Sequence, residues 1–205
     1  MSRILLVHGW GFDPRLWDPL RATLPGQTWL PVDLGYFGPA RTDLPPVLDL
    51  VVGHSFGCLW AMAHPDLAGI PLLAVNGFAR FAAATDCPHG TPLRVLDRML
   101  KRLQEAPREV LVAFHARCST APPQGDLQLP RLALDLQRMR DEDARAVAAR
   151  QPILACAAED DPLVAADLAR EAFAGRLRML PGGGHALPLT RPGALAQVIL
   201  EVLGR

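Results

Sequence analysis

The segment Gly53-His54-Ser55-Phe56-Gly57 follows the apolar run at 48–52 and precedes the mostly apolar stretch at 58–63. This order predicts a buried strand, a sharp turn and a helix. Glycine stands two residues before and two residues after the serine, in the pattern G-x-S-x-G. Such a turn strains the backbone at the serine and brings strand and helix close together, so glycine is needed on both sides. We therefore expect the Ser55 hydroxyl to project from one edge of a sheet.

Other apolar runs alternate with helical segments along most of the chain. We expect strands at 4–7, 28–32, 70–75, 152–157 and 176–180 in addition to 48–52. Helices are expected after Asp13, after the Ser55 turn, within 161–173 and at about 192–203. Strands that alternate with helices predict an α/β fold with a mainly parallel sheet and right-handed crossovers.

The alternation is interrupted at about residues 78–145, where the sequence contains no convincing strand. Two sets of apolar residues recur there at helical spacing. The first set is Leu93, Leu96, Leu100 and Leu103, and the second is Leu129, Leu132, Leu136 and Met139. We interpret 78–145 as a helical lid insertion over the carboxyl edge of the sheet, within one domain that spans 1–205.

Length and composition narrow the class of protein. A chain of 205 residues is long enough for one sizeable core and short for two. Its 21 basic and 21 acidic residues balance, so the total charge suggests neither nucleic acid nor a membrane as partner. No apolar run approaches ~18 residues and no signal peptide is recognisable, so we expect a soluble cytoplasmic protein. We also expect it to be a monomer. Four widely spaced cysteines without a C-x-x-C pair are expected to be free thiols rather than metal ligands. They are Cys58, Cys87, Cys118 and Cys156.

A serine hydroxyl is a weak nucleophile at neutral pH and needs a base, which in turn needs an orienting acid. His185 follows the predicted strand at 176–180 and a glycine turn, which makes it the candidate base. Three neighbouring acids follow the strand at 152–157, namely Glu159, Asp160 and Asp161. All these loops open on the same edge as Ser55. Such chemistry requires no metal and no organic cofactor.

Two backbone N–H groups must stabilise the negative charge that develops on the substrate oxygen. Phe56, directly after the serine, is expected to supply one of them. Trp10, in the glycine loop His8-Gly9-Trp10-Gly11, is the natural second, although it could be only a packing aromatic residue. We expect His8 and His54 to be structural. The remaining histidines, His64, His89 and His115, have no partner pattern and are assigned no role.

These motifs together resemble the α/β-hydrolase superfamily over nearly the whole chain. The segment at 5–11 with Trp17, and the segment at 53–57, resemble the biotin-pathway esterases of the BioH type. Val75-Asn76-Gly77, Gly90-Thr91-Pro92 and the segment at 114–118 are similar to the BioG type. The resemblance implies a six-stranded parallel sheet. It also favours Asp161 as the acid, because Asp161-Pro162-Leu163-Val164 resembles the family pattern of Asp, two residues and Val.

The resemblance implies a serine carboxylesterase that hydrolyses the methyl ester of pimeloyl-acyl carrier protein. Two other functions remain open at this point. The chain could be a small-molecule carboxylesterase or thioesterase of other metabolism, since fold and triad do not select the acyl group. It could also be a non-catalytic binder that uses the hydrolase fold to hold a small ligand.

The charges of the insertion suggest how a carrier protein would bind. Between Arg94 and Arg140 there are nine basic and five acidic residues, so this segment carries +4 and the rest of the neutral chain −4. Arg94, Arg98, Lys101 and Arg102 fall along one side of the predicted helix. Acyl carrier proteins are acidic, so this side is a candidate carrier-binding surface, while the alternative is a solvated amphipathic face.

Overall fold

The computed structural model describes residues 1–204 and contains six strands within two residues of their predicted positions. All neighbouring strands pair in parallel, in the order β2-β1-β3-β4-β5-β6. The predicted α/β class and the six-stranded parallel sheet are therefore confirmed. The strands are β1 (Arg3–Val7), β2 (Thr28–Val32), β3 (Leu50–His54), β4 (Leu72–Val75), β5 (Ile153–Ala158) and β6 (Leu177–Leu180).

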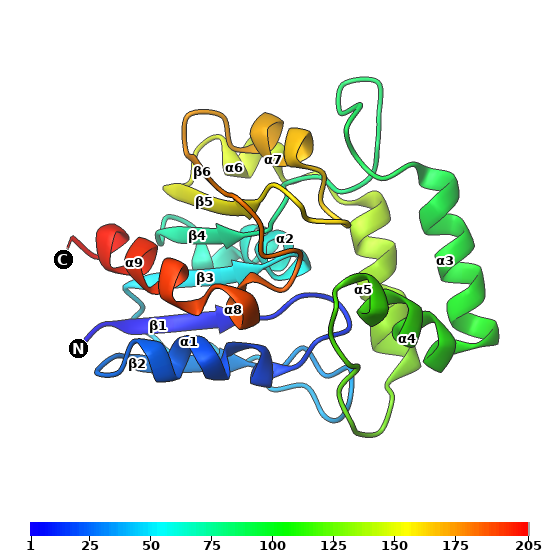
Figure 1. Ribbon diagram of the computed structural model, residues 1–205, viewed down its shortest axis with the longest axis horizontal. Coiled ribbons are helices and arrows are strands. Elements are labelled where there is room, and N and C mark those ends of the chain that lie inside the picture. The colour runs from blue at the N-terminus through cyan, green and yellow to red at the C-terminus, as the bar shows by residue number, and fades with distance from the viewer. Residues whose placement is uncertain (205) are drawn as a thin grey trace.

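Helices cover both faces of the sheet, and a further group stands at its carboxyl edge (Figure 1). In β1, Ile4 and Leu6 pack with α1 and α9, whereas Leu5 and Val7 belong to the opposite core with α2. Within residues 1–204 no helix is both long and apolar enough to cross a bilayer. The 3-10 helices are η1 (Pro14–Trp17) and η2 (Pro65–Leu67). The α-helices are α1 (Asp18–Thr23), α2 (Phe56–Ala63), α3 (Leu93–Glu105), α4 (Pro107–Arg117), α5 (Leu129–Asp141), α6 (Arg145–Ala148), α7 (Ala166–Ala172), α8 (Leu187–Thr190) and α9 (Pro192–Val202).

The strand order creates a crevice between β1 and β3. The chain leaves β1 toward α1 on one face of the sheet and leaves β3 toward α2 on the other face. Loops that diverge in this way leave a gap at the carboxyl ends of the strands, where open α/β sheets bind their ligands. The glycine loop at 8–11 and the turn at Ser55 border this gap.

The turn between β3 and α2 has the strained geometry that its glycines predict. Ser55 has φ 53° and ψ −122°, a conformation that L-residues rarely adopt. A Cβ at Gly57 would overlap the backbone carbonyls of Val7 and His8, and one at Gly53 would overlap the backbone of Cys58. Only glycine lets α2 lie this close to the ends of β1 and β3.

Three helices of the insertion, α3, α4 and α5, stand beyond the carboxyl ends of the strands (Figure 1). Their inward side chains follow the predicted helical spacing, and Leu96, Leu103, Leu132 and Leu136 are buried. Leu93 begins α3 and remains 43% exposed. The four cysteines are buried free thiols, as predicted.

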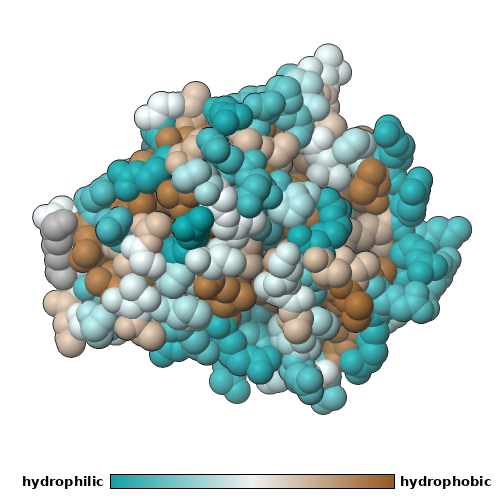
Figure 2. Space-filling view, in the orientation of Figure 1, coloured by the Kyte–Doolittle hydropathy of each residue, from teal (hydrophilic) through white to brown (hydrophobic). Residues whose placement is uncertain are grey.

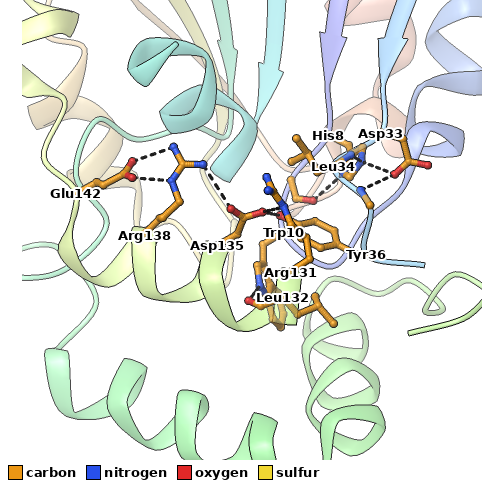
Figure 3. Close-up of polar contacts among 12 residues, drawn as sticks. His8, Trp10, Asp33, Leu34, Tyr36, Arg131, Leu132, Asp135, Arg138 and Glu142 are labelled. Carbon is orange, nitrogen blue, oxygen red and sulfur yellow. Dashed lines mark hydrogen bonds and ion pairs between the residues drawn. The ribbon is translucent and has the colours of Figure 1, made fainter. Parts of the chain in front are cut away.

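A buried carboxylate on α5 ties the insertion to the sheet (Figure 3). Asp135 is fully buried and accepts a hydrogen bond of 2.9 Å from the hydroxyl of Tyr36, which follows β2. Arg131 and Arg138 pair with the same carboxylate at 2.9 and 3.4 Å. Burial raises the pKa of Asp135, while the two arginines and the Tyr36 hydroxyl favour its charged form. This cluster fixes α5 beside the segment that leaves β2.

Candidate active site

Ser55 lies at the end of β3, where the turn presents its side chain to a cavity. Its backbone N–H donates to the carbonyl of Val75 at 2.9 Å, which attaches the strained turn to β4. The residue is only 7% exposed, so its hydroxyl is reached through the cavity rather than from the open surface.

Asp161 and His185 meet at the ends of β5 and β6. His185 Nδ1 lies 2.8 Å from Asp161 Oδ2, and both side chains are 1% exposed. The other carboxylate oxygen, Oδ1, accepts the backbone N–H groups of Leu163 and Val164 at 2.8 and 3.0 Å. These two amides hold the carboxylate so that Oδ2 faces the imidazole.

The neighbouring acids have different environments. Asp160 is exposed, and its Oδ1 accepts the backbone N–H of Gly184 at 2.8 Å. Glu159 is exposed as well. Of the three candidate acids in this loop, the structure therefore brings Asp161 to His185.

The second imidazole nitrogen of His185 is available for proton transfer. Because Nδ1 donates to a carboxylate, Nε2 is the unprotonated nitrogen of the neutral ring. Nε2 is buried and has no hydrogen-bond partner among residues 1–204. His185 therefore keeps a buried, unpaired acceptor within the described residues, as a general base requires.

Asn76 holds the backbone of the His185 loop. Its Nδ2 donates to the carbonyls of Gly184 and His185 at 2.8 and 2.7 Å, and its Oδ1 accepts the N–H of Ala158 at 2.9 Å. The residue has φ 45°, a left-handed conformation in which asparagine is enriched. Its role was not predicted, although asparagine directly after a buried strand and before a glycine is a usable signal.

His54, the residue before Ser55, also holds the His185 loop. Its Nε2 lies 2.9 Å from the His185 carbonyl and therefore carries a proton, which it donates. Burial, together with the nearby His185 ring, holds the pKa of His54 well below its usual value. The ring centroids of His54 and His185 are 4.8 Å apart. A neutral His54 places no positive charge beside the His185 ring.

The glycine loop after β1 is oriented by His8. The ring accepts the Leu34 N–H at Nε2, at 3.0 Å, so Nδ1 carries the proton and donates to the Gly9 carbonyl at 2.9 Å. The N–H of Phe12 donates to the same carbonyl at 3.2 Å. In a trans peptide the Trp10 N–H points opposite to the Gly9 carbonyl. Because His8 and Phe12 both bind the Gly9 carbonyl, the Trp10 N–H points away from them.

The peptide that joins Gly9 to Trp10 lies close to Ser55. A Cβ at Gly9 would be 3.0 Å from the Ser55 Cβ and 2.8 Å from the His54 ring, so only glycine fits there. The Phe56 N–H opens α2, and the first amides of a helix have no carbonyl partner within it. The structure therefore brings the backbone of both predicted oxyanion residues, Trp10 and Phe56, close to Ser55.

The Trp10 side chain fastens the loop to the insertion (Figure 3). Its Nε1–H donates to the Leu132 carbonyl on α5 at 2.8 Å. The indole is 1% exposed and meets the Phe114 ring of α4 edge-on, with centroids 5.0 Å apart. Trp10 is thus a packing residue as well as a candidate oxyanion residue.

The cavity at Ser55 has a volume of about 810 Å³ and lies between the sheet edge and the insertion. Its volume is within the usual range for small-molecule sites. Most of its wall is apolar, and its charged groups are three arginines and one glutamate. The apolar residues include Phe81, Val95, Leu96, Met99, Val110, Phe114, Leu136 and Met139, and the charged residues are Arg98, Arg102, Glu109 and Arg117.

The four predicted carrier-binding residues are all exposed on α3, but they do not share one environment. Arg98 and Arg102 line the Ser55 cavity, whereas Lys101 lines a separate groove between α3 and α5. Arg102 pairs with Glu109 at 2.9 Å, while Arg98 has no ion pair within residues 1–204. Hydrophilic side chains cover the outer edge of the molecule at α3, and hydrophobic ones appear inward of it (Figure 2). Arg98 is therefore the cation of this set that is both unpaired and next to the cavity.

Comparison with known proteins places these features in context. The sequence pattern of the alpha/beta hydrolase family matches residues 4–198. The biotin biosynthesis bifunctional protein BioHC of Cellvibrio japonicus (strain Ueda107) is 30% identical to this chain over 240 residues. The match covers 97% of this chain and 47% of BioHC, so the chain spans about half the length of that relative.

Solved structures share the fold at low sequence identity. The esterase EaEST from Exiguobacterium antarcticum has a TM-score of 0.83 and 15% identity, and the match covers 100% of this chain and 92% of EaEST. A hydrolase from Pseudomonas aeruginosa PA01 has a TM-score of 0.77 and 21% identity, with 100% and 90% covered. The enol-lactonase from Burkholderia xenovorans LB400 has a TM-score of 0.64 and 18% identity, with 100% and 92% covered.

Proposed function

This chain belongs to the alpha/beta hydrolase family, and we propose that it is a serine carboxylesterase. Ser55 is the nucleophile, His185 the general base and Asp161 the acid that orients His185. One observation carries the proposal, namely the 2.8 Å contact between His185 Nδ1 and Asp161 Oδ2 beside a strained serine turn, with His185 Nε2 unpaired in the part of the chain that the structure describes. Esterase activity also agrees with the esterases among the structural neighbours.

Acylation begins when Ser55 Oγ attacks the ester carbonyl carbon and passes its proton to His185 Nε2. The carbonyl oxygen becomes an oxyanion, which accepts hydrogen bonds from the Trp10 and Phe56 N–H groups. Asp161 stabilises the imidazolium on His185 and holds its tautomer. His185 then returns the proton to the leaving alkoxide, the C–O bond breaks, and an alcohol departs from an acyl-serine.

Deacylation repeats these steps with water. His185 Nε2 removes a proton from a water molecule, whose oxygen attacks the acyl carbon. The second oxyanion collapses, the proton moves to Ser55 Oγ, and the carboxylic acid is released. Every proton is thus transferred through one imidazole nitrogen, and no metal or cofactor takes part.

We propose the methyl ester of pimeloyl-acyl carrier protein as the substrate. The relative BioHC belongs to biotin biosynthesis by its name, and the likeness covers nearly all of this chain. The cavity wall is also suitable, because a methyl ester masks a carboxylate that would be costly to bury among apolar side chains. Hydrolysis exposes that charge and so favours release of the product. A carrier-bound substrate implies that the enzyme acts in the cytoplasm.

The decisive experiment compares matched substrates with the purified chain. Pimeloyl methyl ester on its carrier protein should be hydrolysed with a higher kcat/KM than free dimethyl pimelate or p-nitrophenyl butyrate. Expression of the chain should also restore biotin-free growth to a strain that lacks its own pimeloyl-carrier esterase. Activity on small esters without rescue would instead indicate an esterase of other metabolism. Binding of esters without turnover would indicate a non-catalytic binder and overturn the proposal.

A further inference from the structure

The last turn of α4 lies against the glycine loop that supplies Trp10. The Phe114 ring is 5.0 Å from the Trp10 ring and 5.8 Å from the Phe12 ring, centroid to centroid, and meets both edge-on. A Cβ at Gly11 would come within 3.1 Å of Leu111, so helix and loop are in close contact. Part of the insertion is thus packed directly on the loop expected to bind the oxyanion.

Within this turn His115 is fully buried and both ring nitrogens have partners. Nε2 lies 2.8 Å from the Gly11 carbonyl, which can only accept, so Nε2 carries the proton. Nδ1 of the neutral ring then accepts from the Thr120 hydroxyl at 2.8 Å. Burial lowers the pKa of His115, and the neutral ring is the form that makes both contacts.

These contacts mean that His115 cannot serve as a base. It has no free nitrogen and no carboxylate partner among residues 1–204. Its Nε2–H instead donates to the carbonyl of Gly11, the residue that follows Trp10, and this hydrogen bond joins residues 104 positions apart. Gly11 has φ 72°, a left-handed conformation that glycine adopts at little steric cost.

The glycine loop is consequently held at three points. His8 binds the Gly9 carbonyl on one side of Trp10, and His115 binds the Gly11 carbonyl on the other. The Trp10 indole is fixed by the Leu132 carbonyl of α5. Two of the three attachments come from the insertion.

We infer that His115 is a positioning residue for the oxyanion loop: by holding the Gly11 carbonyl it keeps the Trp10 N–H aimed at the oxyanion formed on Ser55. The inference rests on the proposed esterase function and adds to it a role for α4 in the chemical step. The insertion then supports transition-state stabilisation and does more than cover the cavity. A shift of about 1 Å in such a donor can cost up to about 100-fold in rate.

The test uses three variants of the full chain and p-nitrophenyl butyrate as substrate. His115→Leu removes both hydrogen bonds and should lower kcat about 10- to 100-fold with KM nearly unchanged, because the oxyanion forms only after binding. His115→Gln retains an N–H donor and should recover most of that loss. Val112→Ala, on the exposed side of the same helix, is the matched control and should behave as the parent.

Affinity for butylboronic acid separates positioning from general damage. This probe forms a tetrahedral adduct with the serine, so its Ki should weaken in His115→Leu by the same factor as kcat/KM. A loss of kcat with an unchanged Ki would mean a smaller active fraction and would overturn the inference, as would parental kcat in His115→Leu. If that variant does not fold, Thr120→Val removes the other hydrogen bond of the His115 ring, which orients Nε2 toward the Gly11 carbonyl, and should weaken boronate binding several-fold. If the unsubstituted chain binds butylboronic acid but hydrolyses no ester, the proposed function is contradicted. The change in Ki between that chain and His115→Leu would still test the role of His115.

Discussion

The loops at the strand ends and the outer helix of the insertion border the same cavity but are held in different ways. Asp161 is fixed by two backbone amides, and the His185 carbonyl receives hydrogen bonds from both Asn76 and His54. On α3, by contrast, the cavity residues Arg98 and Arg102 are exposed side chains, and within residues 1–204 only Arg102 of these two is ion-paired. Groups that perform chemistry must be pre-organised, whereas groups that attract a partner can remain mobile.

The comparison separates two kinds of substitution. Changes in the strand-end loops should lower the rate on every ester, because all substrates share the same transition state. Changes on the outer side of α3 should alter only which substrate is preferred. Substitutions in α4 and α5 at residues that contact the loop at 8–11 should also lower the rate on every ester.

The largest effect is expected for Ser55→Ala. Loss of the nucleophile should lower kcat by about 10⁴- to 10⁶-fold on both carrier-bound and small esters, because covalent catalysis is lost for both. Alanine lacks only the hydroxyl, so the far-ultraviolet circular dichroism and Tm should stay close to those of the parent. Turnover within tenfold of the parent on either substrate would remove Ser55 from the mechanism.

The next largest effect distinguishes two neighbouring acids. Asp161→Asn should lower kcat by about 10⁴-fold on all esters, because an amide stabilises the wrong tautomer of His185. Asp160→Asn is the matched control and should change kcat little, since an amide oxygen can still accept the Gly184 N–H. Steady-state kinetics on one small ester suffices. The opposite ranking would transfer the role to Asp160.

A smaller, substrate-selective effect is expected on α3. Arg98→Glu reverses a charge beside the cavity and should raise KM for the carrier-bound ester about fivefold at low salt, less at high salt, because surface charges are screened. KM for p-nitrophenyl butyrate should stay within about twofold. Arg150→Glu makes the same charge change at an exposed position outside the cavity wall and serves as control. An equal rise in KM for both substrates would mean that Arg98 supports the structure and does not bind the carrier.

The smallest effect concerns stability where the insertion joins the sheet region. Asp143, near the end of the insertion, pairs with Arg80, near its start, at 2.8 Å and also with Arg145. Hydrogen bonds from Arg145 and Arg80 hold the pKa of Asp143 well below its usual value, despite partial burial. A carboxyl group with a lowered folded-state pKa stabilises the fold above its unfolded pKa of about 4, and this contribution is lost as the pH falls.

Asp143→Asn should therefore lower the free energy of unfolding at pH 7 by about 1 kcal/mol or less, since the pair is partly exposed. The difference from the parent, measured by urea unfolding, should shrink as the pH drops below about 4. Ester hydrolysis at pH 7 should be unchanged. A stability difference independent of pH would show that the ion pairs are not its source.

Much of the fold could be predicted because its signals are local. Each strand is a short apolar run, and the Ser55 turn requires glycines whose spacing is visible in the chain. Parallel topology then carries the loops with Ser55, Asp161 and His185 to one edge of the sheet without further information. The carrier-binding surface was predicted only as a charge pattern. Helical spacing placed Arg98 and Lys101 on one side of α3, but packing against α5 gives them different surroundings.

The sequence by itself determined the sheet, the strained serine turn and the order of the serine, acid and histidine along the chain. Only the tertiary structure decided which of three adjacent acids meets His185, and that Asn76 and His115 support the site from 109 and 104 positions away. The physical reason is that secondary structure follows from neighbouring residues. The hydrogen-bond partner of a buried donor depends on how distant elements pack. A shift of one residue along a loop changes which side chain lies next to that donor.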